Sequence, residues 1–421
     1  MLKLLIGSTK THLSHLEPKR QRKRNDKAQA AYDRAIEAVI ANLAYMVLRP
    51  TDSGRLVVPM NTGTKRLRYQ HPLLAVTNLR KVINLLDGNI LQLTKGRHRS
   101  ETSTIEPRDW FLSLVDQHSI TIEDFGRDPN EEVIILSHKS KGLAHTSEGV
   151  VWRKIPEWID YTDTAETIAR REWLRKLNAF LREADISFVD DGLSPQVCTE
   201  DRTMQRRFSL LSRKDVRWDL GGRLFGGFWQ QLKRERRDGL RIGGEPVADL
   251  DLKNAFARLA YLHVGQEMPE DDAYDLSGFL PGYHNDLHRD GVKNGFSALL
   301  FGGAADCSEI KAKLPPGTNH KHLRAALEAK HPALAPLFQT TVGYALMHTE
   351  SRILIGALDR LMMQGVVALG MHDGLMVAVS QQEAAQRALE AASEEIVGAR
   401  LPVVTKVVCG LPRATKGLLI A

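Results

Sequence analysis

The stretch that decides the fold lies near the C-terminus and is Val366-Val367-Ala368-Leu369-Gly370-Met371-His372-Asp373-Gly374-Leu375-Met376-Val377-Ala378-Val379. Two apolar, β-prone runs flank His372-Asp373-Gly374, and Asp-Gly between such runs strongly indicates a β-hairpin. The turn would hold the Asp373 carboxylate at the tip of two buried strands, as a metal ligand would be held. The same three residues also suit an ordinary turn, so the choice depends on what stands upstream.

Length and composition indicate a globular chain of two or three domains, with 421 residues, 43% of them hydrophobic and 26% charged. Lys and Arg exceed Asp and Glu by 58 to 51, which suits nucleic acid or acidic lipid as a partner without identifying either. No apolar run approaches the ~20 residues that span a bilayer. The three widely spaced cysteines are typical of reduced thiols. We therefore expect a cytoplasmic protein without a membrane partner; the sequence does not indicate an oligomeric state.

The first hundred residues predict a basic α+β domain, which could be of the winged-helix type. Apolar residues at helical steps predict helices over 26–49 and 72–91, and residues 55–60 between them favour a strand. Basic clusters are either solvated surface or phosphate-binding segments. These clusters lie at 18–24, at Lys65, Arg66 and Arg68, and at Lys95, Arg97, His98 and Arg99.

Residues 101–160 predict a β-rich connecting region, with strands at 110–115 and 133–136. A helix is expected to open near Thr164. The carboxylates Asp160, Asp163 and Glu166 could form a metal cluster, but favourable placement at this helix N-terminus explains them more simply.

Glycines dominate the next informative stretch, which runs from Trp218 to Gln230 and contains Asp219-Leu220-Gly221-Gly222-Arg223. Four glycines within seven residues allow tight turns and close approach of a ligand. Arg223 among them is placed to meet phosphate. The neighbouring aromatic residues could stack on bases or belong to the core.

Residues 247–252 alternate as in a strand and then become helical. Asp249 and Asp251 are two residues apart, so on a strand they share one face. Two such carboxylates are costly together unless a cation neutralises them. An alternative is that Asp251 caps the following helix.

A cationic helix is predicted around residues 289–301. Arg289, Lys293, Ser297 and Phe301 follow one another at four-residue steps, so they would lie along one stripe of the helix. A polyanion lying along this stripe would relieve the repulsion between the two cations; a solvated basic helix is the alternative.

Together these elements supply what metal-assisted phosphoryl transfer requires. Two carboxylates can hold two divalent cations, one activating the attacking oxygen and one the leaving oxygen. Cationic side chains neutralise charge on the phosphates, and a flat ring supports a base.

The order and spacing of these motifs resemble the palm and fingers of the family A nucleic acid polymerases, the group of bacterial DNA polymerase I and the phage single-subunit RNA polymerases. The resemblance covers roughly residues 206–405. It includes short sequence motifs that are similar to those of polymerase-like proteins of phages and mobile elements. Four motifs carry it: Asp219-x-x-Gly222-Arg223, the strand ending at Asp251, Arg289-x-x-x-Lys293 followed by Phe301-Gly302, and His372-Asp373.

The resemblance implies a role for each matched residue. Asp251 and Asp373, aided by the Leu252 carbonyl, would bind two Mg²⁺ ions, which Mn²⁺ could replace. Arg289 and Lys293 would grip the incoming nucleoside triphosphate. The remaining implied roles are Phe301 and Ser297 beside the nucleotide, His372 at the primer end or the hairpin, and Asp219, Gly222, Arg223 and Gln230 along the primer–template.

Several positions depart from the family pattern. Gly374 stands where DNA polymerase I has a glutamate, Phe301 replaces a tyrosine, and Ser297 replaces a bulky aromatic. Phe256 occupies the position of a sugar-sensing glutamate and is similar to the aromatic residue of reverse transcriptases that excludes a ribose 2′-hydroxyl. This favours dNTPs as substrates.

The resulting expectation is an α+β, right-hand polymerase with an antiparallel palm sheet, small helical fingers, a reduced thumb and a basic N-terminal α+β accessory domain. The expected segments are 1–100 (accessory), 101–160 (connecting), 161–214 (helical, thumb-like), 215–262 with 345–421 (palm) and 263–344 (fingers). We expect a DNA polymerase without a proofreading domain, serving phage or mobile-element replication or repair. A primase or RNA polymerase on the same scaffold, and a polymerase fold kept only for nucleic-acid binding, remain alternatives.

Overall fold

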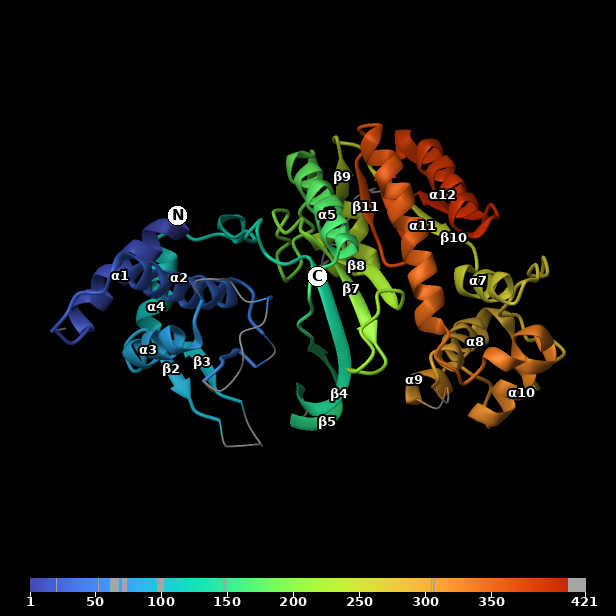
Figure 1. The fold of residues 1–421 in the computed structure, drawn as a ribbon, viewed down its shortest axis with the longest axis horizontal. Coiled ribbons are helices and arrows are strands. Elements are labelled where there is room, and N and C mark those ends of the chain that lie inside the picture. Colours follow the sequence, from blue (N-terminus) through green and yellow to red (C-terminus); the bar gives the residue numbers. More distant parts are fainter. Residues whose placement is uncertain are drawn as a thin grey trace, which may run out of the picture. The chain divides into compact units, whose positions relative to one another are not determined.

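The computed structural model describes residues 1–19, 21–51, 53–60, 68–69, 74–96, 102–146, 149–303, 305 and 307–407. These residues form two compact units (Figure 1). Unit 1 comprises Met1–Thr164, Asp190–Thr203 and Gly226–Phe228, and unit 2 comprises Ala165–Val189, Met204–Phe225 and Trp229–Ala421. Some residues singled out above lie outside the described ranges, namely Arg20, Lys65, Arg66, Arg97, His98, Arg99 and Cys409.

The described residues of unit 1 contain four α-helices, a small sheet and two longer strands within 134–158. The helices are α1 (Leu2–Leu16), α2 (Asp26–Leu48), α3 (Val76–Leu86) and α4 (Asp109–Gln117). The sheet has the order β1 (Leu56–Val57), β3 (Thr104–Pro107), β2 (Leu91–Thr94), and its pairs are antiparallel. Helix α2 begins where the sequence predicts, because the Asn25 side chain accepts a hydrogen bond from the Ala28 amide. Fully buried residues such as Leu5, Ile40, Leu43 and Leu86 form the core.

The predicted strand at 110–115 is wrong, because these residues lie within helix α4. Phe111 and Val115 are buried one helical turn apart, so a period of 3.6 suits the segment better than a period of two. Helix α3 ends at Leu86, five residues earlier than predicted, where Asp87 and Gly88 turn the chain into β2. The strand predicted at 133–136 is confirmed as the start of β4 (Ile134–Thr146), which pairs antiparallel with β5 (Gly149–Trp158).

Unit 2 contains the predicted hairpin within a four-stranded antiparallel sheet. The order is β11 (Ala368–Gly370), β12 (Gly374–Ala378), β10 (Val247–Leu252), β13 (Val403–Val407). The turn is closed by the Met371 amide, which donates to the Gly374 carbonyl over 2.8 Å. Helices α11 (Gly343–Met363) and α12 (Gln382–Val397) pack together and against these strands (Figure 1). The sheet thereby holds the Asp373 turn on a buried base.

Helical segments follow β10 along the chain. Helix α7 (Ala255–His263) comes first, and α8 (Asn285–Leu300), α9 (Ser308–Lys311), α10 (His320–Lys330) and the 3-10 turn Pro332–Leu337 form the segment between α7 and α11. The cationic helix predicted near 289–301 is confirmed as α8, with Phe301 at its C-cap. Asp251 does not cap α7, whose N-cap is Asn254 in a left-handed conformation.

The remaining part of unit 2 precedes the sheet along the chain. It consists of α5 (Ala165–Glu183), the strands β6 (Ile186–Phe188), β7 (Met204–Leu210), β8 (Gly221–Gly226) and β9 (Leu240–Ile242), and short helices at Phe228–Gln231 and Arg234–Gly239. The prediction that residues 161–214 are helical holds only for α5. In β7, Arg206, Phe208 and Leu210 are buried while Arg207 and Ser209 between them are more exposed, which is the period of a strand.

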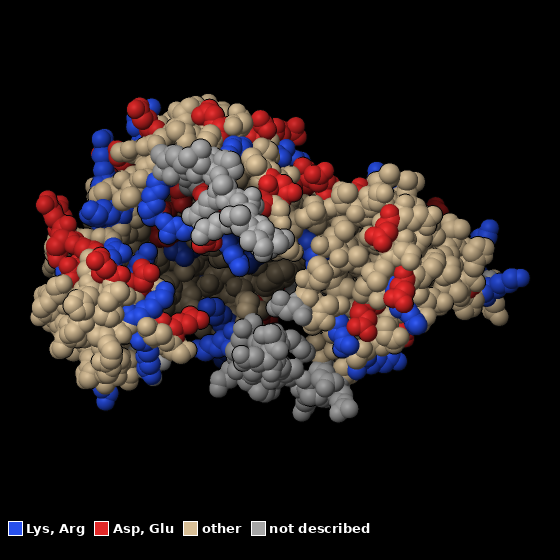
Figure 2. Space-filling model, turned by 180° about the vertical axis from the view of Figure 1, so that it is seen from behind, with Lys and Arg blue, Asp and Glu red and all other residues tan. Residues whose placement is uncertain are grey.

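Charged residues are intermixed on the face drawn in Figure 2, where Lys and Arg (blue) lie beside Asp and Glu (red). Within the described ranges, no helix combines the length and apolar character needed to cross a membrane. The described helices and strands together form a mixed α+β fold with several small sheets.

Candidate active site

The strand pairing of unit 2 brings together the two aspartates that the sequence singles out. Asp251 lies opposite Gly374 in the β10–β12 register, so it is next to the turn that carries Asp373. The approach is close: a Cβ built on Gly374 would fall well inside 3.0 Å of the Asp251 carboxylate. Asp373 itself is exposed at the tip of the turn, whereas Asp251 is half-buried.

The two aspartates of β10 share a face, as predicted. Asp249 and Asp251 are both half-buried, whereas Ala248, Leu250 and Leu252 between and beyond them are buried. Asp249 lies 3.8 Å from the guanidinium of Arg237, but burial still raises the pKa of its carboxyl.

The electrostatic environment of Asp251 is unfavourable to its own charge. Burial, followed by repulsion from Asp249 and Asp373, raises the pKa of Asp251 to about 6, while Lys406 and Lys293 oppose the shift. A bound cation would remove this penalty. The carboxylates of Asp251 and Asp373, with the Leu252 carbonyl at the end of β10, are hard oxygen donors of the kind that Mg²⁺ prefers.

The donor set is small. Among the described residues, no group of three or more His, Cys, Asp and Glu side chains is arranged to hold a metal ion. Two carboxylates would suffice if substrate phosphates and water complete the coordination, as is usual for Mg²⁺ at phosphate-transfer sites.

Glu350, a carboxylate on α11 that is only 1% exposed, is not among the site residues predicted from the sequence. Its Oε2 accepts hydrogen bonds from Nε and Nη2 of Arg223 over 2.8 and 2.6 Å, and its Oε1 is buried without a hydrogen-bond partner. Burial raises the pKa of Glu350, an effect that Arg223 opposes and Asp373 reinforces. A sequence pattern could have revealed it, because Glu350 falls at helical steps from buried Leu346 and Leu354.

Arg223 is thus half-buried in an ion pair rather than freely exposed. Its guanidinium also lies 5.5 Å from the centre of the Phe256 ring. The pair ties β8 to α11, and a contact of Arg223 with a nucleic acid strand stays a prediction.

His372 belongs to the aspartate turn and packs toward β8. Its ring is 5.0 Å from that of Phe225, and its Nδ1 is buried without a hydrogen-bond partner. Burial lowers the pKa of His372, and the nearby Arg223 adds to this effect. A neutral imidazole on this side of the turn can position Asp373 or a ligand hydroxyl.

The two cations of α8 differ in their availability. Arg289 donates from Nε to Asp272 over 2.5 Å and from Nη2 over 3.1 Å, so a phosphate would have to compete with that carboxylate. Lys293, one turn further on, is exposed. Its positive charge partly offsets the rise in pKa that burial causes in both Asp251 and Glu350. Of the two cations, Lys293 is therefore the one that is coupled to the carboxylates.

Aromatic rings gather where α7, α8 and α11 meet. The ring centres of Phe256 and Phe301 are 5.7 Å apart, and those of Phe301 and Tyr344 are 5.0 Å apart at 90°. Ser297 is half-buried one turn before Phe301, and its backbone carbonyl accepts a hydrogen bond from the Phe301 amide over 3.1 Å. Phe256 lies in the first turn of α7, just beyond the end of β10, so these contacts hold its ring close to the strand that carries Asp251.

The glycine-rich stretch places its other candidates at structural positions. Gln230 donates from its side-chain amide to the Gly370 carbonyl over 2.9 Å, and the Trp229 indole donates to the same oxygen over 3.0 Å. Both therefore hold the base of the hairpin. Gly222 has a φ of 85°, which strains any other residue, and a Cβ there would lie only 3.0 Å from the Phe208 ring.

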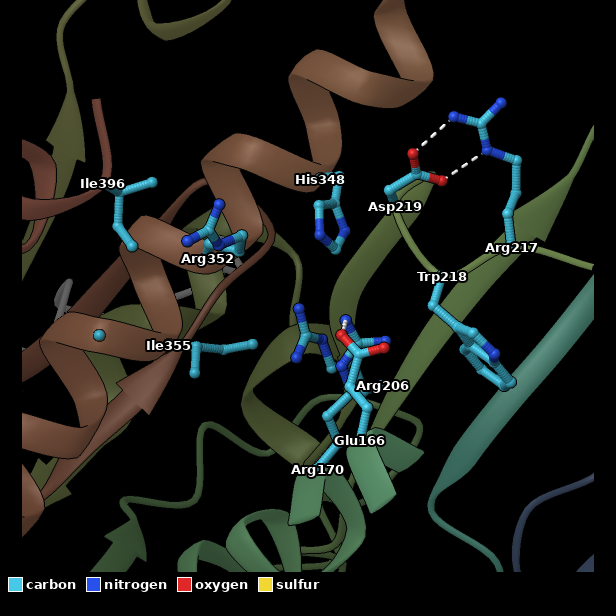
Figure 3. Close-up of a pocket in the computed structure, with 11 residues that line it drawn as sticks. Glu166, Arg170, Arg206, Arg217, Trp218, Asp219, His348, Arg352, Ile355 and Ile396 are labelled. Atoms are coloured by element: carbon cyan, nitrogen blue, oxygen red, sulfur yellow. Dashed lines mark hydrogen bonds and ion pairs between the residues drawn. The ribbon is translucent and has the colours of Figure 1, made fainter. Parts of the chain in front are cut away.

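Asp219 lies apart from the carboxylates of β10 and the hairpin. It forms an ion pair with Arg217 and lines a separate cavity (Figure 3). The structure thus gathers Asp251, Asp373, His372 and Arg223 near one end of the sheet strands, with Lys293 coupled to the carboxylates electrostatically. It does not place Asp219 among them, and Gln230 contacts the Gly370 carbonyl of the hairpin instead.

Comparisons with known proteins add no family assignment. No protein-family model matches this sequence, and no curated protein sequence matches it at a significant level.

Proposed function

We propose that this protein is a template-directed nucleotidyltransferase, a DNA polymerase with a right-hand arrangement of palm, fingers and reduced thumb. The observation that carries the proposal is the β10–β12 register, which sets Asp251 beside the turn bearing Asp373. The raised pKa of Asp251 supports it, because clustered carboxylates without a counter-ion are costly to keep in a fold.

The residues of the site have distinct tasks in this proposal. Asp251, Asp373 and the Leu252 carbonyl would hold Mg²⁺, which when bound activates the attacking hydroxyl and stabilises charge on the leaving phosphate. Lys293 neutralises charge on the triphosphate, and Arg289 adds to it once phosphate replaces Asp272.

Other residues position these groups. The buried Arg223–Glu350 pair fixes β8 against α11, and His372 holds the turn through its contact with Phe225. Phe256 and Phe301 offer an apolar wall for the sugar and base of the incoming nucleotide. A ring at position 256 would crowd a ribose 2′-hydroxyl, which favours dNTPs.

A second candidate is a nucleic-acid-binding protein that keeps this fold without polymerising. The ion pair between Arg289 and Asp272 favours it, since a cation meant for phosphate is already engaged. The exposed Lys293 coupled to the carboxylates argues for the enzyme.

Extension of a labelled primer tests the proposal, on DNA and on RNA templates, with dNTPs or rNTPs and Mg²⁺. We expect extension by the wild-type protein and its loss in Asp373→Asn, which removes one charge without changing the size of the side chain. Asp116→Asn, which changes an exposed carboxylate of α4 in unit 1, is the matched control. Absence of extension together with intact primer–template binding would favour the second candidate.

A further inference from the structure

A cavity of unit 2 lies apart from the carboxylate site. Its volume is about 610 Å³, and its lining comes from α5, β7, the segment 217–219, α11 and α12 (Figure 3). Asp251, Asp373 and Lys293 do not line it. The volume is larger than one phosphate ion and falls within the range of small-molecule sites.

Arginines dominate the polar lining of this cavity. Arg170, Arg206, Arg217 and Arg352 supply four positive charges, against the two carboxylates of Glu166 and Asp219. Both carboxylates are already engaged. Glu166 accepts from Arg170 over 2.5 Å, and Asp219 accepts from Arg217 over 2.5 and 2.6 Å.

Two arginines are left without a carboxylate partner among the described residues. Arg206 is only 6% exposed and donates through Nε to the Gly222 carbonyl over 2.9 Å. Arg352 is exposed on α11. A buried guanidinium without an ion-pair partner is costly, and an anion in the cavity would remove that cost.

Further polar atoms of the cavity are unpartnered. Nη1 of Arg170 and Nδ1 of His348 are buried and form no hydrogen bond. Burial and the charges of Arg170 and Arg352 lower the pKa of Arg206 to about 9. Burial, followed by the charges of these three arginines, lowers the pKa of His348 to about 4, so its neutral ring can donate to an oxyanion.

Stacking within the protein explains only part of the arrangement. Arg170 and Arg206 each lie 4.8 Å from the centre of the Phe208 ring, and the Trp218 ring meets the same ring edge to face at 5.1 Å. These contacts fix the positions of the three side chains. They account neither for Arg352 nor for the excess of positive charge.

We propose that this cavity binds the phosphate group of a nucleotide, with Arg170, Arg206 and Arg352 as its ligands and Trp218 beside the base or sugar. Planar guanidinium groups suit phosphate because they donate two parallel hydrogen bonds. The nucleotide is either free or part of a nucleic acid strand. The proposal does not rest on polymerase activity, since no carboxylate of β10 or the hairpin takes part.

Calorimetric titration in EDTA tests this site without the metal-dependent one. The probes are dAMP, and a short single-stranded DNA with and without a 5′-phosphate. Arg352→Gln removes an exposed charge of the cavity, and Arg387→Gln removes an exposed charge on α12 outside it. We expect Arg352→Gln to weaken binding roughly tenfold or more and Arg387→Gln to leave it unchanged.

The probes separate the two sources. If dAMP binds and Arg352→Gln weakens this binding, the cavity is a free-nucleotide site. If DNA binds but dAMP does not, and Arg352→Gln weakens the DNA binding, the cavity holds a phosphate of a nucleic acid strand. Arg170→Gln should reproduce the loss, and Asp373→Asn should leave binding intact. The proposal is overturned if no probe binds, or if Arg352→Gln and Arg170→Gln bind as the wild-type protein does while thermal melting confirms that both are folded.

Discussion

Substituting Gly374 with alanine should damage both the stability of unit 2 and the proposed metal site. The Cβ of the new residue would fall inside 3.0 Å of the Leu250 carbonyl and of the Asp251 carboxylate. Leu250 lies in the centre of β10, paired with β12 and β13, so its backbone cannot move aside without breaking these pairs. The substitution must therefore separate β10 from the turn that carries Asp373.

The expected cost follows from the identity of the obstructing atoms. Overpacking a well-filled core costs about 1–3 kcal/mol when side chains can adjust. At Gly374 a backbone carbonyl is involved, so we expect a loss of about 3 kcal/mol in the free energy of unfolding. Gly370→Ala offers a graded comparison in the same hairpin, because its Cβ meets only methyl groups of Leu358 and Leu224, at 3.2 and 3.4 Å. About 1 kcal/mol is expected there.

Urea unfolding followed by tryptophan fluorescence measures these differences, with Mg²⁺ affinity measured on the folded variants. Gly126→Ala is a neutral control, since nothing lies within 4 Å of the added methyl group. A Gly374→Ala variant that is as stable as Gly126→Ala and binds Mg²⁺ as tightly as the wild-type protein would refute the predicted clash.

Three further predictions concern the same site. Arg223→Met should lower the free energy of unfolding by about 3–5 kcal/mol, because it leaves the buried Glu350 carboxylate unpaired. Adding Glu350→Gln should restore part of this stability. Urea unfolding would contradict the prediction if the double variant were no more stable than Arg223→Met alone. Since burial and the neighbouring carboxylates raise the pKa of Asp251 to about 6, above its ordinary 3.8, ionisation of this one group should cost the metal-free protein roughly 2–3 kcal/mol as pH rises from 4 to 6, and Mg²⁺ affinity should fall below pH 6. Unfolding and Mg²⁺ titrations across this range check both signs, and flat profiles would exclude the shift. Phe256→Ala should raise rNTP use relative to dNTP use roughly tenfold in primer extension, and an unchanged ratio would remove Phe256 as a sugar gate.

Local patterns predicted the elements that carry the site. The Asp-Gly turn between apolar runs predicted the hairpin of β11 and β12, and alternation predicted the common face of Asp249 and Asp251. Both depend on a few neighbouring residues. Residues 110–115 misled the prediction for the same reason, because a short apolar run suits a strand and a buried helix equally, and only packing decides between them.

Partners distant in sequence could not be predicted in this way. Arg223 and Glu350 are 127 residues apart, and nothing in either local pattern indicates their contact. Arg289 and Asp272 are closer, but their pairing depends on how the chain turns between α7 and α8. Such pairs change the expected chemistry, because each engages a cation that the sequence alone leaves free for phosphate.

The glycine at 374 links these two kinds of information. By sequence it is a departure, a missing glutamate beside the Asp373 that the resemblance makes a metal ligand. By structure it is a requirement, since β10 approaches so closely that no side chain fits. The close approach is also what sets Asp251 beside the turn. The absence of a side chain at 374 and the juxtaposition of Asp251 with the Asp373 turn therefore have a single structural cause, the tight pairing of β10 with β12.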